Sequence, residues 1–113
     1  MSVLAIDQGT SSTKALVVGE NGEVVTEAEV AVHPVAGDDG SVEIDPEELW
    51  QSVVQAGRGA LTQMNARDEP VTAIGLANQG ETVLAWDPES AQPLSRALVW
   101  QDRRAASVCE RLL

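Results

Sequence analysis

The stretch of sequence most suggestive of chemistry is residues 7–14, which read Asp-Gln-Gly-Thr-Ser-Ser-Thr-Lys. Short apolar runs lie on both sides, so these residues are expected to form a tight turn between two strands. Gly9 lets the backbone bend and lets a ligand come close. Successive turn N–H groups can form an anion-binding concavity. The hydroxyl groups that could donate to phosphate oxygens belong to Thr10, Ser11 and Ser12. The turn is therefore a candidate phosphate site.

Two charged residues of this turn would suit a nucleotide. Lys14 adds a positive point charge for a phosphate group. Asp7 ends an apolar run predicted to be a buried strand, and a carboxylate there could hold a magnesium ion, directly or through water. The alternative is a Ser/Thr-rich hairpin turn that Asp7 merely caps. Composition alone favours this plain turn, because turns commonly use these residue types.

The segments around the turn predict a three-stranded antiparallel meander. Residues 3–6 and 13–18 read as strands, and residues 24–32 alternate apolar and polar side chains. The Asn21-Gly22 pair is a strong hairpin signal between the second and third of these strands. Residues 33–44 are expected to form a loop.

The second half of the chain predicts a helix, further strands and a final helix. Pro46 and Glu48 mark a helix start that Asp45 would cap, and the helix is expected to run to about Asn65. Its apolar positions at helical spacing are Leu49, Val53, Ala56, Ala60, Leu61 and Met64. Gly57 and Gly59 weaken this helix but permit close packing on a sheet.

After this helix, residues 71–77 read as a buried strand and residues 78–81 as a polar turn. Residues 82–86 and 97–100 are expected to be strands joined by a loop. A last helix is predicted over residues 102–113, and the residues on its inner face are expected to be Ala105, Val108, Cys109 and Leu112. Cys109 is therefore interpreted as a small buried hydrophobic residue.

The composition limits the possible partners. The net charge is -11, which should repel nucleic acid and anionic membranes. No stretch approaches the roughly 20 apolar residues of a membrane span, and no basic segment begins the chain. A single cysteine fits a reducing cytoplasm, and the only histidine, His33, makes a metal site of its own improbable. These features predict a cytoplasmic protein without nucleic-acid or membrane partners.

The predicted order of elements, β-β-β-α-β and then a helix, is typical of the opening of a ribonuclease H-like domain. We therefore expect an α/β fold with a mixed sheet whose first three strands are antiparallel. Such a domain normally adds further strands and helices, so the fold is expected to be incomplete at its C-terminus. An exposed edge at residues 71–77 would favour a homo-oligomer.

Four segments resemble the FGGY carbohydrate kinase family, the group that includes glycerol kinase, within the actin-like ATPase superfamily. Residues 7–14 resemble the phosphate-binding hairpin shared by that superfamily. Residues 42–50, 74–82 and 99–104 resemble signatures of glycerol kinases in particular, in the family's order. The resemblance implies that residues 1–113 are the N-terminal part of the first kinase domain, with the second domain absent.

The resemblance also implies roles for single residues. The nucleotide phosphates would be bound by Gly9, Thr10, Ser11, Ser12 and Lys14, and Asp7 would hold Mg²⁺. Glu81 would bind hydroxyl groups of a polyol or sugar, and Trp100 would pack on its carbon chain. Gly80 stands where the family has an arginine that also binds the polyol, so the identity of the acceptor stays open.

The implied activity is ATP-dependent phosphoryl transfer to a hydroxyl group of a polyol or sugar. The family's general base lies beyond residue 113, so no catalytic residue is assigned here and the chain is expected to be inactive alone. The alternative is a non-catalytic binding module with an actin-like fold. A chaperone or filament ATPase is disfavoured by the segments at residues 78–81 and 100–104. Arg103 and Arg104 are interpreted mainly as surface ion-pair residues.

Overall fold

The computed structural model describes all residues from 1 to 113. The chain divides into two units, which are described separately. The first comprises residues 1–32 and 47–79, and the second comprises residues 33–46 and 80–113. No helix in the chain combines the length and the apolar character that crossing a bilayer requires.

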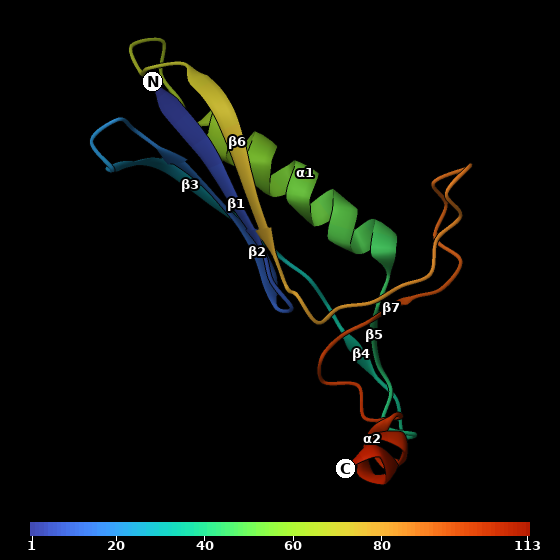
Figure 1. Ribbon diagram of the computed structural model, residues 1–113. Helices are drawn as coiled ribbons and strands as arrows, with labels where there is room; N and C mark the ends of the chain where they lie inside the picture. Colours follow the sequence, from blue (N-terminus) through green and yellow to red (C-terminus); the bar gives the residue numbers. More distant parts are fainter. The chain divides into compact units, whose positions relative to one another are not determined.

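The first unit is built on a four-stranded mixed sheet. Its strands are β1 (Ser2–Gln8), β2 (Ser12–Val18), β3 (Val24–Ala31) and β6 (Val71–Asn78), in the order β3-β2-β1-β6 (Figure 1). β1 pairs with β2 and β2 with β3 in antiparallel fashion, whereas β6 runs parallel to β1. Gly22 has a φ of 81°, as the predicted Asn-Gly turn requires. The predicted meander and its mixed sheet are confirmed.

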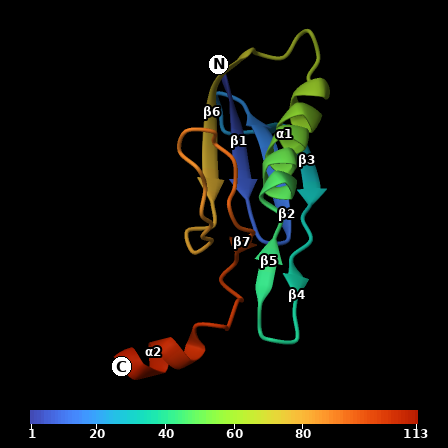
Figure 2. The same cartoon turned by 90° about the vertical axis from the view of Figure 1, so that its right-hand side faces the viewer.

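Helix α1 (Pro46–Thr62) packs on one face of this sheet (Figure 2). The buried core between them consists of Leu4, Ile6, Ala15, Val17, Ala56 and Ala60. A Cβ atom on Gly59 would lie 3.0 Å from the Cβ of Ala28, and one on Gly57 would lie 3.4 Å from the Cδ1 of Ile6. The two glycines therefore allow the close helix–sheet packing that was predicted.

The far end of α1 differs from the prediction. The helix stops at Thr62 instead of about Asn65, because Gln63 and Met64 donate to carbonyls three residues back, at Ala60 and Leu61. Such bonds tighten the last turn and end a helix. Leu61, predicted on the inner face, is 39% exposed.

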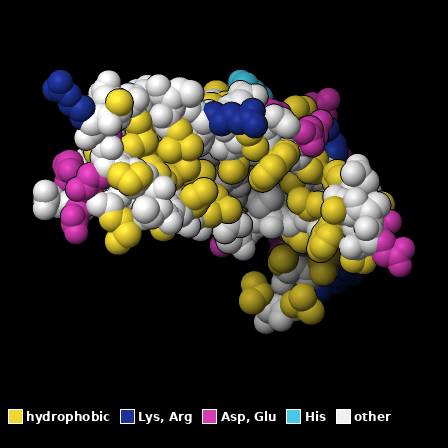
Figure 3. All heavy atoms as spheres, turned by 90° about the horizontal axis from the view of Figure 1, so that it is seen from above, with side chains coloured by type: hydrophobic (Ala, Val, Ile, Leu, Met, Phe, Trp, Pro, Cys, Tyr) yellow, Lys and Arg dark blue, Asp and Glu magenta, His cyan; other side chains and the backbone are white.

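Strand β6 forms as predicted but is not buried. Ile74 and Leu76 are paired with Leu4 and Ile6, so their side chains project on the face that carries α1. They are nevertheless 68% and 64% exposed, because β6 is the edge strand and α1 lies over β1 to β3. Apolar side chains are prominent on the surface drawn in Figure 3. This strand leaves both an apolar strip and an unpaired edge at the surface.

The second unit contains a small sheet that the sequence did not fully reveal. Its strands β4 (Val35–Ala36), β5 (Val42–Ile44) and β7 (Ala97–Leu98) are antiparallel, in the order β4-β5-β7. The prediction of a plain loop over residues 33–44 was therefore wrong. The turn between β4 and β5 contains Gly40 at a φ of 84°. These strands are too short to show an alternating pattern.

Two further expectations for this unit need correction. Residues 82–86 contain no strand, only single bridges that pair Val83 with Leu98 and Trp86 with Pro93. The last helix, α2 (Ala106–Leu112), begins later than residue 102 and has no buried residue. Cys109 is exposed, because no other element packs against the predicted inner face of α2.

Candidate functional site

The hairpin that joins β1 to β2 is held by backbone hydrogen bonds. The Gly9 N–H donates to the Ser12 carbonyl at 2.9 Å, and the Val32 N–H donates to the Ser11 carbonyl at 3.0 Å. A Cβ atom on Gly9 would lie 2.9 Å from the Ser12 carbonyl oxygen. This contact with backbone could not be relieved by a side-chain rotation, so the tight turn requires glycine.

A hollow of about 330 Å³ opens beside this hairpin. The residues around it are Asp7, Gly9, Thr10, Ser11, Ser12, Lys14 and Glu29. Every residue that the sequence suggested for phosphate or metal binding is therefore gathered at one place. Three hydroxyl groups and an ammonium group in one concavity can bind an anion.

Asp7, Lys14 and Glu29 form a charged row across three strands. Asp7 is the register partner of Lys14 on β2, and Lys14 is the partner of Glu29 on β3. All three lie on the face opposite α1. Asp7 is exposed, so the expectation that it sits at the end of a buried strand was wrong. The alternation of β1 places Leu4 and Ile6 inside and Asp7 outside.

Glu29 is the one residue of this hollow that sequence reasoning did not single out. Its Oε1 accepts a hydrogen bond of 2.5 Å from the Ser12 hydroxyl. The alternation of β3 was a usable signal, because Thr26 and Ala28 face the core and Glu29 must then face outward with Lys14. Ser12 would have to exchange this partner to bind a phosphate oxygen.

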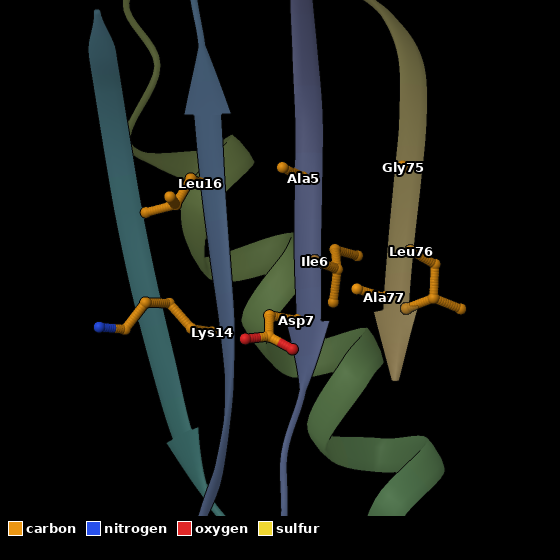
Figure 4. A pocket seen from close by; sticks show the side chains of 8 residues that line it. All are labelled: Ala5, Ile6, Asp7, Lys14, Leu16, Gly75, Leu76 and Ala77. Carbon is orange, nitrogen blue, oxygen red and sulfur yellow. The ribbon is translucent and has the colours of Figure 1, made fainter. Parts of the chain in front are cut away.

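A second, larger hollow of about 560 Å³ shares Asp7 and Lys14 with the first. Figure 4 shows its lining, which comes from β1, β2 and β6. Apart from the two charged side chains it is apolar, and small residues such as Ala5, Gly75 and Ala77 make its floor. The charged row thus lies at the border between a polar and an apolar depression.

Asp7, the predicted magnesium ligand, has one other carboxylate near it at the polar hollow. No group of three or more His, Cys, Asp or Glu side chains is placed to hold a metal ion. Asp7 and Glu29 are the two carboxylates of the polar hollow. Mg²⁺ bound with nucleotide phosphates needs only one or two protein carboxylates. The residues present therefore fit an ion that arrives with the phosphates, but not a protein-only metal site.

The predicted acceptor residues lie in the second unit. Val83 and Leu98 exchange two backbone hydrogen bonds, of 3.0 and 2.8 Å. Glu81 precedes this pair by two residues and Trp100 follows it by two, so both lie at the same end of the bridge. Both side chains are exposed. An indole face beside a carboxylate suits a polyol, which has CH and OH sides.

The backbone conformation at position 80 does not require glycine. Its φ is not among the positive values of the chain, which are those of Gly22, Gly40 and Ala91. A Cβ atom added to Gly80 would meet no atom within 4 Å. A side chain can therefore be accommodated at this position.

Arg104 forms an ion-pair network with β5. Its Nη2 lies 2.7 Å from Glu43 Oε1 and 2.7 Å from Asp102 Oδ2, and Arg96 Nε lies 3.3 Å from Glu43 Oε2. Hydrogen bonds from Arg104 and then from the Val42 N–H hold the pKa of Asp102 well below its ordinary value. Arg104 thus has the structural role that was favoured for it.

Nearly the whole chain is similar to proteins of one known family. Residues 2–113 match the family model described as the FGGY family of carbohydrate kinases, N-terminal domain. A glycerol kinase from Thermus brockianus is 46% identical over 110 residues, which is 97% of this chain and 22% of the relative. The chain therefore spans about a fifth of the length of the curated relatives that it matches.

Solved structures of kinases share the fold. The glycerol kinase of Plasmodium falciparum, solved with ADP, is 29% identical with a TM-score of 0.85 over 98% of this chain and 22% of its own. The xylulose kinase of Rhodospirillum rubrum has a TM-score of 0.89 at 22% identity, over 99% of this chain and 23% of its own. At 22% identity, the similarity to the xylulose kinase concerns the fold alone. With the family model matched over residues 2–113, the chain belongs to the FGGY family of carbohydrate kinases, as part of its N-terminal, actin-like ATPase domain.

Proposed function

We propose that the chain supplies the nucleotide-phosphate site of a kinase that transfers the terminal phosphoryl group of ATP to a hydroxyl group of a polyol or sugar. The observation that carries this proposal is the polar hollow at the β1–β2 hairpin, which gathers Gly9, its three neighbouring hydroxyl groups and Lys14. The relatives named glycerol kinase and the ADP complex of one of them support it.

In this proposal the hairpin acts by positioning and by neutralising charge, which is how phosphoryl transfer is mostly catalysed. The turn N–H groups and the hydroxyls of Thr10, Ser11 and Ser12 donate to phosphate oxygens. Lys14 offsets part of the phosphate charge. Asp7 would bind the Mg²⁺ ion, directly or through a water molecule. When bound, that ion would neutralise charge that develops on the phosphate oxygens.

The acceptor is proposed to bind in the second unit. Glu81 would accept hydrogen bonds from hydroxyl groups, and Trp100 would cover the CH side of the same molecule. No carboxylate of this chain is assigned as general base for the acceptor hydroxyl. Residues 1–113 by themselves are therefore expected to lack phosphoryl-transfer activity. We further propose a cytoplasmic location, where Mg-ATP is available, and a homo-oligomeric assembly.

The test uses the full-length kinase with Mg-ATP and a panel of polyols and sugars. Asp7→Ala should lower kcat/KM by a factor of at least a hundred, because losing one stabilising contact to transition-state charge costs about 2.7–4 kcal/mol. Asp38→Asn is a matched control, since Asp38 is an exposed carboxylate in the β4–β5 turn. Near-normal rates for Asp7→Ala would refute its role. No transfer by the wild type to any acceptor would favour a non-catalytic binding module.

A further inference from the structure

Gln79, the residue after β6, reaches back to the phosphate hairpin. Its Nε2 lies 3.2 Å from the Gly9 carbonyl oxygen and 3.5 Å from Gln8 Oε1. The same Gly9 carbonyl accepts a second hydrogen bond, of 2.7 Å, from Gln8 Nε2. Two side-chain amides therefore converge on one backbone carbonyl at the start of the hairpin, and one of them is 70 residues away in sequence.

This contact extends the sheet beyond its last backbone pair. The parallel register of β1 and β6 ends at Gln8 paired with Asn78. One residue further, the Gln79 side chain replaces the missing backbone pairing by donating to Gly9. The hairpin is thus joined to β1 covalently and to the end of β6 by the hydrogen bond from the Gln79 side chain.

The orientation of the Gln79 amide is determined by its surroundings. If the amide were reversed, Oε1 would face the Gly9 carbonyl, and two acceptors would oppose each other. In the orientation present, Oε1 is shielded from solvent and has no hydrogen-bond partner. Buried acceptors without a donor are uncommon in folded proteins and call for an explanation. The Nε2 group of Gln79 has hydrogen-bond acceptors, whereas its Oε1 has no donor. The side chain is therefore oriented by its contact with the Gly9 carbonyl.

We propose that Gln79 is a positioning residue that fixes the phosphate hairpin through its hydrogen bond to the Gly9 carbonyl. It touches neither nucleotide nor acceptor. By holding the Gly9 carbonyl it keeps the hairpin N–H and hydroxyl groups turned toward the phosphates. The inference rests on the proposed kinase function.

The experiment compares Gln79→Glu and Gln79→Met in the full-length kinase. Gln79→Glu keeps the shape but places a carboxylate oxygen against the Gly9 carbonyl. At neutral pH the KM for Mg-ATP should rise about three- to tenfold, the worth of one hydrogen bond. As the pH falls and the introduced carboxyl takes up a proton, it becomes an O–H donor and the KM should return toward the wild-type value measured at the same pH. Gln79→Met should show the rise without this recovery.

One further measurement and one control variant distinguish a failure of this proposal from a failure of the proposed kinase function. Amide hydrogen exchange over residues 8–13 should be faster in both variants than in the wild type, and this readout needs no activity. Gln55→Glu, at an exposed position of α1, is the matched charge control and should change neither quantity. Unchanged KM and unchanged hairpin exchange, with at most a lower melting temperature, would overturn the proposal. A wild type without phosphoryl transfer would refute the proposed function, and hairpin exchange alone would then decide whether Gln79 anchors Gly9.

Discussion

Replacing Gly80 with arginine should raise the activity of the full-length kinase toward glycerol. From the resemblance to glycerol kinases, an arginine is expected at the position of Gly80. The space for a Cβ atom there is open, and the φ of Gly80 is not positive. A guanidinium group offers up to five donors beside Glu81. Hydrogen bonds to a small polyol should contribute about 1–3 kcal/mol, or roughly ten- to two-hundredfold in kcat/KM. The gain should be larger for glycerol than for longer polyols and sugars, which would compete for the space that the arginine fills.

The assay is a set of specificity constants for glycerol, longer polyols, aldoses and ketoses, measured for the wild type, Gly80→Arg and Gly80→Ala. Gly80→Ala adds the Cβ atom without the guanidinium, so it should leave the specificity unchanged. Its stability should be equal to the wild type or higher by about 0.4–1 kcal/mol, because the unfolded chain loses freedom. The reasoning fails if the wild type already uses glycerol efficiently and Gly80→Arg only damages it. The family assignment would be unaffected by that outcome.

The other predictions concern the isolated chain of residues 1–113. Because Ile74 and Leu76 expose an apolar strip on an edge strand, it should self-associate in analytical ultracentrifugation, and Leu76→Gln should shift it toward monomer. A monodisperse wild-type monomer with a high, cooperative melting transition would contradict this. The pKa of Asp102 is lowered from 3.8 by Arg104 and the Val42 N–H, so its stabilisation is complete above about pH 4 and is lost as the pH falls further. Melting temperatures across acidic pH should therefore fall less steeply for Asp102→Asn, and equal slopes for both proteins would refute the role of this carboxylate.

The parts of the fold that the sequence predicted are those specified by local signals. The Asn21-Gly22 turn and the alternation of residues 24–32 identify the hairpins of the first unit. Asp45 and Pro46 mark the start of α1, and the hairpin motif itself identified the residues of the polar hollow apart from Glu29. Each of these depends on a few neighbouring residues, so one sequence is sufficient.

The features that were missed depend on contacts between distant segments. β4 and β5 are only two and three residues long, and β5 is completed as the central strand by β7, far along the chain, through the pairing of Glu43 with Leu98. The exposure of Ile74 and Leu76 follows from the edge position of β6, which an apolar run cannot reveal. Gln79 is an ordinary polar residue in the sequence, and only the parallel pairing of β1 with β6 brings its amide to Gly9.

The hydrogen bond between Ser12 and Glu29 has a consequence for the kind of nucleotide that this hollow can accept. The hollow contains two carboxylates, Asp7 and Glu29, and one ammonium group, Lys14, so it carries one negative charge in excess. An uncomplexed polyphosphate would approach two like charges and would compete with Glu29 for the Ser12 hydroxyl. If this hollow binds the nucleotide as proposed, a divalent cation brought by the nucleotide would turn the same carboxylates into attractive groups. The metal complex should then bind more tightly than the bare anion, and titrating the full-length kinase with ADP, with and without Mg²⁺, measures that difference directly.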